Sequence, residues 1–218
     1  ILSGLVGSEM CIRDRIQTAE NLARRYGITR PEVDAYASQS QARALAAQER
    51  GLFDEEIVTV DNEVLALEGY EPRAIRLPRK TAAQSRDTHP RHSPVEVLAG
   101  LRPVYEGGVQ TAGNSSALVD GAAAAVVVHG GYLREHGLHA LARLRGAAAA
   151  GVPPEIMGIG PVPAIQALLQ RAGLRLDEIG LFEVNEAQGA QTLAVARELE
   201  IDLDRLNVNG GAIAIGHP

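Results

Sequence analysis

Two side chains in the sequence combine a reactive type with a position suited to chemistry, His217 and Asn185. His217 follows a glycine and the apolar run 212–215, which we expect to be strand-like. An imidazole at the end of a strand can project into a crevice and accept a proton near neutral pH. Asn185 precedes Glu186 at a predicted junction between a strand and a helix. Helix capping by Asn185 or Glu186 is the structural alternative to a role in chemistry.

Other familiar reactive motifs are absent from the sequence. It has no G-x-S-x-G turn, no H-E-x-x-H pair, no P-loop and no paired-cysteine spacing, so we predict no metal site. The single cysteine, Cys11, cannot form an internal disulfide bond. The histidines other than His217 are expected at the surface. We interpret the glycine pair in 210–217 as close packing rather than phosphate binding.

The composition is typical of a globular protein with a core of small aliphatic side chains. Of the 218 residues, 45% are hydrophobic and only 3% are aromatic, and 23 are glycine. Such a composition suits closely packed α/β layers. The formal net charge of -6 argues against a protein that mainly grips nucleic acid or an anionic membrane. No apolar run approaches the ~18 residues of a membrane span.

A basic stretch interrupts this acidic chain between residues 73 and 91, where the only acidic residue is Asp87. A solvated loop would explain such a stretch. Contact with an anion is the alternative, because arginine offers paired donors to phosphate oxygens. The basic residues are Arg73, Arg76, Arg79, Lys80, Arg86 and Arg91.

The first half of the chain is predicted to begin with two adjacent helices. Gly27 ends the first, and Thr29 and Glu32 form a capping box at the start of the second. The predicted elements are helices over 18–26 and 29–50, a short strand over 56–60, an irregular excursion over 61–94 and a short helix over 94–101.

From about residue 119 onward, strands and helices alternate, which favours an α/β fold. The run 122–128 is interpreted as a buried strand or a helix that leads into one. The other predicted elements are strands over 140–145, 179–184 and 206–209 and helices over 161–172 and 187–199.

Both ends of the sequence indicate a fragment. Residues 1–15 lack the pattern of a signal peptide and resemble a translated sequencing adapter, so we expect them to be non-native. The sequence begins without Met and stops at Pro218, inside a glycine-rich motif.

Five short motifs, in a fixed order, resemble those of the thiolase family, the acetyl-CoA acetyltransferases and 3-ketoacyl-CoA thiolases. They lie at 111–116, 120–124, 157–161, 185–187 and 207–218. The resemblance covers about residues 16–218 and implies an α/β fold with α-β-α-β-α layers, incomplete here, and a loop domain that covers coenzyme A. On that template, 16–118 is the loop domain, 119–137 ends the N-terminal thiolase half and 138–218 begins the C-terminal half.

The resemblance also implies roles for five residues. Arg91 matches an arginine near the nucleotide end of CoA, and Ser116 matches a serine that hydrogen-bonds the pantetheine arm. Met157 matches a residue that lines the acyl and pantetheine tunnel. His217 matches the histidine that activates the nucleophilic cysteine and contributes to an oxyanion hole. Asn185 matches the asparagine that holds the water completing that hole.

The implied activity is acyl transfer between a cysteine thioester and acetyl-CoA or CoA, as Claisen condensation or thiolysis in fatty acid metabolism and beta-oxidation. CoA and acyl-CoA are then substrates, with no tightly bound cofactor. The resemblance implies a cytoplasmic homo-oligomer, a dimer or tetramer at full length. The alternative is a non-catalytic CoA-binding or lipid-carrier relative. The ketoacyl-ACP synthases use a histidine where Asn185 stands, so Asn185 favours the thiolases.

The sequence also departs from the family pattern. The nucleophilic cysteine belongs upstream, and the acid/base cysteine belongs in a C-x-G motif after His217. Cys11 has none of the expected neighbours and is not assigned either role. Gln188 stands where the family usually has Phe, which could alter the packing of the pocket. We expect the 218-residue chain itself to be inactive.

Overall fold

A computed structural model of the chain describes residues 8–62, 64–65, 68–69, 73–74, 77 and 80–218. Of the predicted basic stretch, Arg76 and Arg79 lie outside these residues, as does the side chain of Arg73. So do residues 1–7 of the segment that we expect to be non-native. Within the described ranges, no helix has both the length and the apolar character that crossing a membrane requires.

The two N-terminal helices form where local sequence signals predict them. α1 (Ser8–Tyr26) begins before the predicted start and ends at Gly27, which has a φ of 60°. α2 (Arg30–Glu49) follows the predicted capping box. The backbone N–H and the hydroxyl of Thr29 both donate to Glu32 Oε2 at 2.7 Å. Both helix predictions are confirmed.

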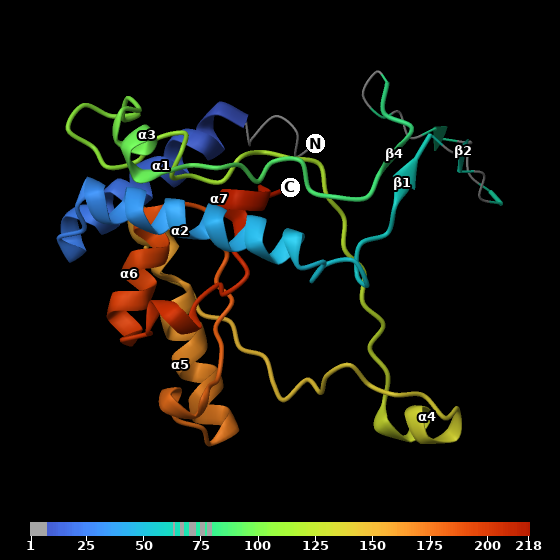
Figure 1. The fold of residues 1–218 in the computed structure, drawn as a ribbon. Coiled ribbons are helices and arrows are strands. Elements are labelled where there is room, and N and C mark those ends of the chain that lie inside the picture. The colour runs from blue at the N-terminus through green and yellow to red at the C-terminus, as the bar shows by residue number, and fades with distance from the viewer. Residues whose placement is uncertain (1–7, 63, 66–67, 70–72, 75–76, 78–79) are drawn as a thin grey trace.

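Most of the later helices pack with α1 and α2 into one helical body (Figure 1). They are α3 (Val95–Ala99), α5 (Pro161–Ala172), α6 (Gly189–Leu199), α7 (Ala212–Ile215) and the 3-10 turns η1 (Pro154–Ile159), η2 (Leu176–Glu178) and η3 (Leu203–Arg205). α2 contacts α3, α6 and α7, while α1 contacts α6 and η1. α6 is buried along most of its length because these neighbours cover it.

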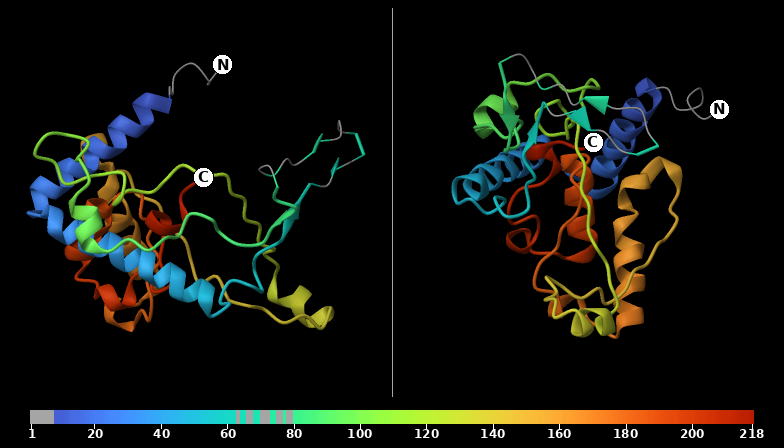
Figure 2. Two further views of the ribbon diagram at one scale, coloured as in Figure 1. Left: turned by 45° about the horizontal axis from the view of Figure 1, so that its top comes forward. Right: turned by 90° about the vertical axis from the view of Figure 1, so that its right-hand side faces the viewer.

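The predicted irregular excursion contains two short antiparallel strand pairs. β1 (Val60–Asp61) pairs with β4 (Ala83–Gln84), and β2 (Val64–Leu65) pairs with β3 (Arg73–Ala74). Figure 2 shows that this arm extends away from the helices. The strand predicted over 56–60 forms only at its last residue, because 57–59 pair with no other described segment.

Neither the strand or helix predicted over 122–128 nor the strand predicted over 140–145 forms in the described structure. The chain leaves the helical body over 119–129, forms α4 (Gly130–Glu135) and returns over 136–150 (Figure 1). Val126 is 91% exposed and Leu141 is fully exposed. A strand needs a neighbour for its backbone N–H and C=O groups. Among the described residues, neither 122–128 nor 140–145 has a backbone hydrogen bond to another segment.

The C-terminal region confirms the helices predicted over 161–172 and 187–199, which are α5 and α6. The strands predicted over 179–184 and 206–209 reduce to a parallel bridge between Phe182 and Leu206. The run 212–215, which we expected to be strand-like, is instead the short helix α7. The backbone N–H of Ile215 donates to the Gly211 carbonyl at 3.0 Å, which closes a helical turn.

Candidate functional site

The carboxyl group of Glu186 organises the region around the candidate site. Glu186 is fully buried. Its Oε1 accepts hydrogen bonds from the Tyr36 hydroxyl at 2.6 Å and from Asn207 Nδ2 at 2.9 Å. Its Oε2 accepts from the Ser40 hydroxyl at 2.7 Å and from the Ile213 backbone N–H at 3.1 Å. One side chain therefore ties together α2, the segment before α7 and α7 itself.

This arrangement overturns the helix-capping interpretation of Asn185 and Glu186. Both oxygens of Glu186 bind other elements, and the residue that precedes α6 is Gln188. Burial, followed by the neighbouring Glu186 carboxyl, raises the pKa of the Tyr36 hydroxyl far above its ordinary value. Tyr36 therefore stays protonated and can donate to Glu186 at any physiological pH.

Two glycines let α7 approach α2 closely, as we expected for the Gly-Gly pair. A Cβ on Gly211 would lie 2.5 Å from Glu186 Cδ, which is too close for any side chain. Gly210 has a φ of 80°, and a Cβ there would lie 2.6 Å from the Ser40 carbonyl oxygen. A left-handed conformation of this kind favours glycine. Both positions therefore require glycine for steric reasons.

His217 is held by the segment that follows the motif at 111–116, which we call the serine motif. Its backbone N–H donates to the Ala117 carbonyl at 2.8 Å, and it forms a parallel bridge with Leu118. Gly216, with a φ of 90°, turns the chain before His217. A Cβ on Gly216 would lie 2.4 Å from Val119 Cγ1, so the two segments are in close contact. His217 is half-buried.

The serine motif also contacts the motif at 185–187, Asn-Glu-Ala. The backbone N–H and the hydroxyl of Ser116 both donate to the Ala187 carbonyl, at 3.2 and 3.1 Å. The hydroxyl of Ser115 donates to Gln188 Oε1 at 2.6 Å. The backbone carbonyl of Asn114 accepts from Gly189 N–H at 2.9 Å. Motifs about 70 residues apart in the sequence are thus neighbours in space.

A cavity of about 280 Å³ brings three of the five predicted site residues together. His217, Asn185 and Met157 line it, and they come from three different motifs. Ser116 does not line it, but its hydroxyl donates to the carbonyl of Ala187, which does. The other residues of the wall are Arg15, Thr18, Gly158, Pro161, Ala187, Gln188 and Gln191. We call this space the motif cavity.

The structure does not bring Arg91 to the motif cavity. The backbone N–H of Arg91 donates to Gln41 Oε1 at 2.9 Å, and its guanidinium lies 3.2 Å from His89 Nε2. Burial, and then the charge of Arg91, lower the pKa of His89. Arg91 is exposed, so its guanidinium faces solvent at the surface.

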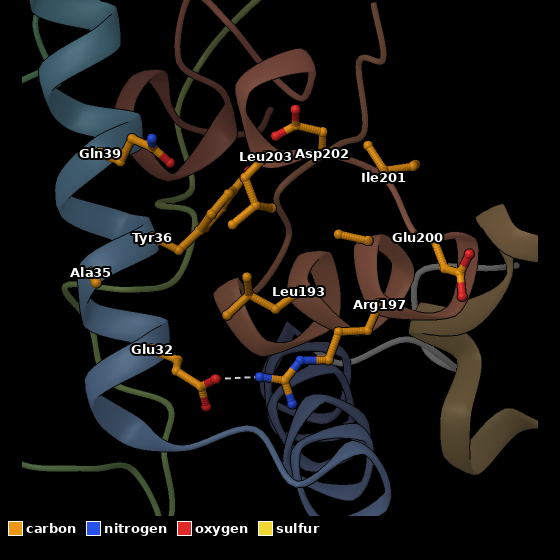
Figure 3. A pocket seen from close by; sticks show the side chains of 11 residues that line it. Glu32, Ala35, Tyr36, Gln39, Leu193, Arg197, Glu200, Ile201, Asp202 and Leu203 are labelled. Atoms are coloured by element: carbon orange, nitrogen blue, oxygen red, sulfur yellow. Dashed lines mark hydrogen bonds and ion pairs between the residues drawn. The ribbon is translucent and has the colours of Figure 1, made fainter. Parts of the chain in front are cut away.

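A larger groove of about 690 Å³ lies between α2 and α6 and does not carry the motif residues (Figure 3). In Figure 3, Tyr36 and Glu32 from α2 point toward Leu193 and Arg197 from α6. Arg197 forms an ion pair with Glu32. None of the residues that line this groove belongs to the five motifs, so the smaller motif cavity is the candidate site.

Sequence reasoning did not single out Gln191 as a residue of the motif cavity, and it named Gly158 only as part of the motif at 157–161. A Cβ on Gly158 would lie 2.6 Å from Gln191 Cγ, so the glycine makes room for the glutamine side chain. Gln191 lies three residues after Gln188, and residues at that spacing share one helix face. That spacing is the signal that could have indicated Gln191 once Gln188 was noticed.

The motif cavity presents an imidazole and several carboxamide groups but no acidic side chain and no cysteine. Among the described residues, no group of three or more His, Cys, Asp or Glu side chains is placed to hold a metal ion. An imidazole can take a proton from a thiol, and amide groups can stabilise an oxyanion. Such a set of groups suits acyl transfer better than carboxylate-based hydrolysis.

Comparison with known proteins identifies the family. The model of the N-terminal thiolase domain matches residues 15–131, and that of the C-terminal thiolase domain matches residues 138–218. The chain belongs to the thiolase family. The family predicted from the motifs and the α/β thiolase fold class are therefore confirmed, with the fold present only in part.

The relatives of this thiolase chain are about twice its length. Acetyl-CoA acetyltransferase of Escherichia coli (strain K12) is 47% identical over 203 residues, which are 92% of the chain and 48% of that protein. The crystal structure of the Bacillus anthracis acetyl-CoA acetyltransferase matches with a TM-score of 0.84 and 44% identity over 93% of the chain and 48% of that protein. Human mitochondrial 3-ketoacyl-CoA thiolase in complex with CoA matches with a TM-score of 0.78 and 40% identity, over 93% of the chain and 47% of that protein. The chain spans about half the length of these relatives.

Proposed function

We propose that the chain supplies the histidine and asparagine side of the active site of an acyl-CoA C-acyltransferase. The reaction is a Claisen condensation of acyl-CoA units or its thiolytic reverse on a 3-ketoacyl-CoA. The observation that supports this function is the motif cavity, in which His217, Asn185 and Met157 line one space. The names of the relatives, acetyl-CoA acetyltransferase and 3-ketoacyl-CoA thiolase, support the same reaction class.

In this proposal His217 and Asn185 carry the chemistry. The His217 imidazole takes the proton from a cysteine thiol, because the thiolate is the nucleophile that accepts the acyl group. When the thioester is deprotonated at its α-carbon, charge develops on the thioester oxygen. His217 and a water held by Asn185 donate hydrogen bonds to that oxygen. Asn185 is exposed and its side chain has no hydrogen-bond partner among the described residues, so it is free to hold a water.

CoA contacts are proposed for three residues. The Ser116 hydroxyl donates a hydrogen bond to the Ala187 carbonyl, so its oxygen can still accept one from an amide N–H of the pantetheine arm. Met157 is 48% exposed on the wall of the motif cavity and offers apolar surface to the same arm. The Arg91 guanidinium at the surface offers donors to the nucleotide phosphates.

The proposal requires cysteines that the motif cavity lacks, since none of its wall residues is a cysteine. We propose that the 218-residue chain alone does not turn over substrate and that further sequence supplies both thiols. We also propose residues 16–118 as the CoA-covering loop domain, 119–137 as the end of the N-terminal half and 138–218 as the start of the C-terminal half. The whole protein is proposed to be a cytoplasmic homo-oligomer of fatty acid metabolism and beta-oxidation.

Two assays test this function. In the first, the purified chain is incubated with acetoacetyl-CoA and CoA, and we expect no loss of thioester beyond that of a protein-free control. In the second, residues 16–218 replace the matching 203-residue stretch of the E. coli acetyl-CoA acetyltransferase. We expect the chimera to cleave acetoacetyl-CoA. A folded chimera that binds CoA without turnover would instead indicate a non-catalytic CoA-binding relative.

A further inference from the structure

One buried carboxamide on α2 lies between two parts of the proposed site. Gln41 is 1% exposed, and it neither lines the motif cavity nor takes part in the proposed chemistry. Its Oε1 accepts a hydrogen bond from the Arg91 backbone N–H at 2.9 Å. Its Nε2 donates to the Ile213 backbone carbonyl at 3.2 Å. Gln41 therefore connects the segment that contains Arg91 to α7.

The bond to Ile213 lies near the end of α7, four residues before His217. If the helix continued, the backbone N–H of His217 would donate to the Ile213 carbonyl. Instead, the His217 N–H donates to the Ala117 carbonyl at 2.8 Å, and Gln41 Nε2 donates to the Ile213 carbonyl. A buried carbonyl at a helix end needs such a partner. Gln41 therefore leaves the His217 backbone available for the contact that holds it beside the serine motif.

On the other side, α2 holds residues 87–91, which we call the Arg91 loop. Gln41 binds the backbone of Arg91, so the exposed guanidinium remains at the surface. About two turns further along α2, Gln48 Nε2 donates to the Asp87 carbonyl at 3.0 Å. The Arg91 loop is thus attached to α2 at two points. Of these two glutamines, the one with a hydrogen bond to α7 in the described structure is Gln41.

We propose that Gln41 is a positioning residue that couples the Arg91 loop to the backbone of His217. The inference rests on the proposed function, in which Arg91 contacts the nucleotide phosphates and His217 takes the thiol proton. Oε1 and Nε2 belong to one planar amide, so a rotation that breaks one of its two bonds also breaks the other. A nucleotide that immobilises the Arg91 loop therefore favours the orientation of Gln41 in which the Ile213 carbonyl has its donor. Binding at the surface thereby fixes His217 at the motif cavity.

The test follows the backbone amide signal of His217 by nuclear magnetic resonance in the 218-residue chain with isotope-labelled histidine. The probe is adenosine 3′,5′-bisphosphate, which represents the nucleotide end of CoA and has no pantetheine arm to enter the motif cavity. We expect the His217 signal to shift on addition of the probe. The shift should follow the binding curve that isothermal titration calorimetry gives for the same probe. The variant His217→Ala identifies the signal.

Two variants separate the coupling from simple attachment of the Arg91 loop. Gln41→Met is close to glutamine in size and removes both hydrogen bonds. We expect it to abolish the shift of the His217 signal while circular dichroism shows a folded chain. Gln48→Met is the matched control, because it removes the bond to the Asp87 carbonyl and leaves the bond to α7 in place. This control should keep the shift.

Gln41→Glu tests the bond to Ile213 through its dependence on pH. A protonated carboxyl can accept from the Arg91 N–H and donate to the Ile213 carbonyl, whereas a carboxylate can only accept. Burial raises the pKa of such a carboxyl. We therefore expect the probe to shift the His217 signal at acid pH and to lose this effect as pH rises through that pKa. The unaltered chain, measured over the same range, accounts for the titration of the probe and of the histidines.

The outcomes separate this inference from the proposed function. If the probe binds but the His217 signal does not move, or moves equally in Gln41→Met, the inference is wrong and the proposed function stands. If Gln41→Met does not fold, Gln41→Glu decides, because a shift that does not change with pH relative to the unaltered chain contradicts the coupling. If the probe does not bind, the CoA contact proposed for Arg91 and the coupling are both overturned.

Discussion

The hydroxyl of Tyr36 and the carboxyl group of Glu186 lie 2.6 Å apart in the core, although the two residues are 150 positions apart in the sequence. Tyr36 is on α2, and Glu186 belongs to the motif that contains Asn185. Because Glu186 also binds the backbone of α7, this pair connects α2 to the turn that ends at His217. The geometry of the motif cavity therefore depends on a polar contact outside it.

Removing the Tyr36 hydroxyl should destabilise the chain. We expect Tyr36→Phe to lower the free energy of unfolding by about 1–3 kcal/mol, because Glu186 Oε1 loses a buried donor. Tyr26→Phe is a matched control, since the Tyr26 hydroxyl donates to Glu198 at an exposed site, and its effect should stay within about 0.5 kcal/mol. Urea unfolding measures both. Equal effects for the two variants would contradict the importance of the buried pair.

The same pair predicts how stability changes at alkaline pH. In the unfolded chain a tyrosine loses its proton near pH ~10, whereas burial and Glu186 raise the pKa of Tyr36 in the folded chain. Above that pH the unfolded state binds fewer protons than the folded state, so the free energy of unfolding falls as pH rises. The slope from this one group is up to about 1.4 kcal/mol per pH unit.

Urea unfolding measures the free energy of unfolding of the unaltered chain and of the Tyr36→Phe variant from about pH 8 to about pH 11. This range brackets the ordinary tyrosine pKa. The stability difference between the two proteins should shrink as pH rises above ~10. Other groups that titrate in this range are common to both proteins and cancel. A difference that stays constant across the range would show that Tyr36 titrates normally in the folded chain.

Steric crowding at Gly211 gives a third prediction. Gly211 has an extended backbone with a φ of -153°, which alanine adopts easily. Any loss of stability on substitution by alanine therefore comes from contact of the new Cβ with Glu186. We expect Gly211→Ala to cost about 2–4 kcal/mol, because the Glu186 carboxyl must move away from its donors. Gly180→Ala is the control, since a Cβ there meets nothing within 4 Å. Thermal unfolding that shifts equally in both variants would refute the steric argument.

The helices could be predicted from the sequence because their signals are local. The capping box of Thr29 and Glu32 and the stop at Gly27 depend only on neighbouring residues. The strands could not be predicted in the same way. Residues 122–128 and 140–145 have strand-like composition, but a strand also needs a partner, and the described chain provides none. The run 212–215 was misread because four apolar residues fit a strand or a helical turn equally well.

The candidate site was predicted only as a set of motifs, and their spatial arrangement required the structure. Nothing local in the sequence indicates that both oxygens of Glu186 bind residues on α2 and around α7. The resemblance implied five site residues, and three of them, His217, Asn185 and Met157, line one cavity in the structure. Arg91 is separate from that cavity. An open groove of about 690 Å³ between helices had no sequence signal at all.

The chemical role of His217 can be measured in the chimera with the E. coli acetyl-CoA acetyltransferase. We expect His217→Ala to lower kcat for acetoacetyl-CoA cleavage by about 10²–10⁴-fold, the usual contribution of a general base. The backbone N–H of His217 makes its bond to Ala117 without the side chain, so the chimera should remain folded. His139→Ala, at an exposed position, serves as the control and should leave kcat unchanged. If His217→Ala retained full kcat while circular dichroism showed a folded chimera, the base would have to lie elsewhere, and the assignment of chemistry to the motif cavity would fail.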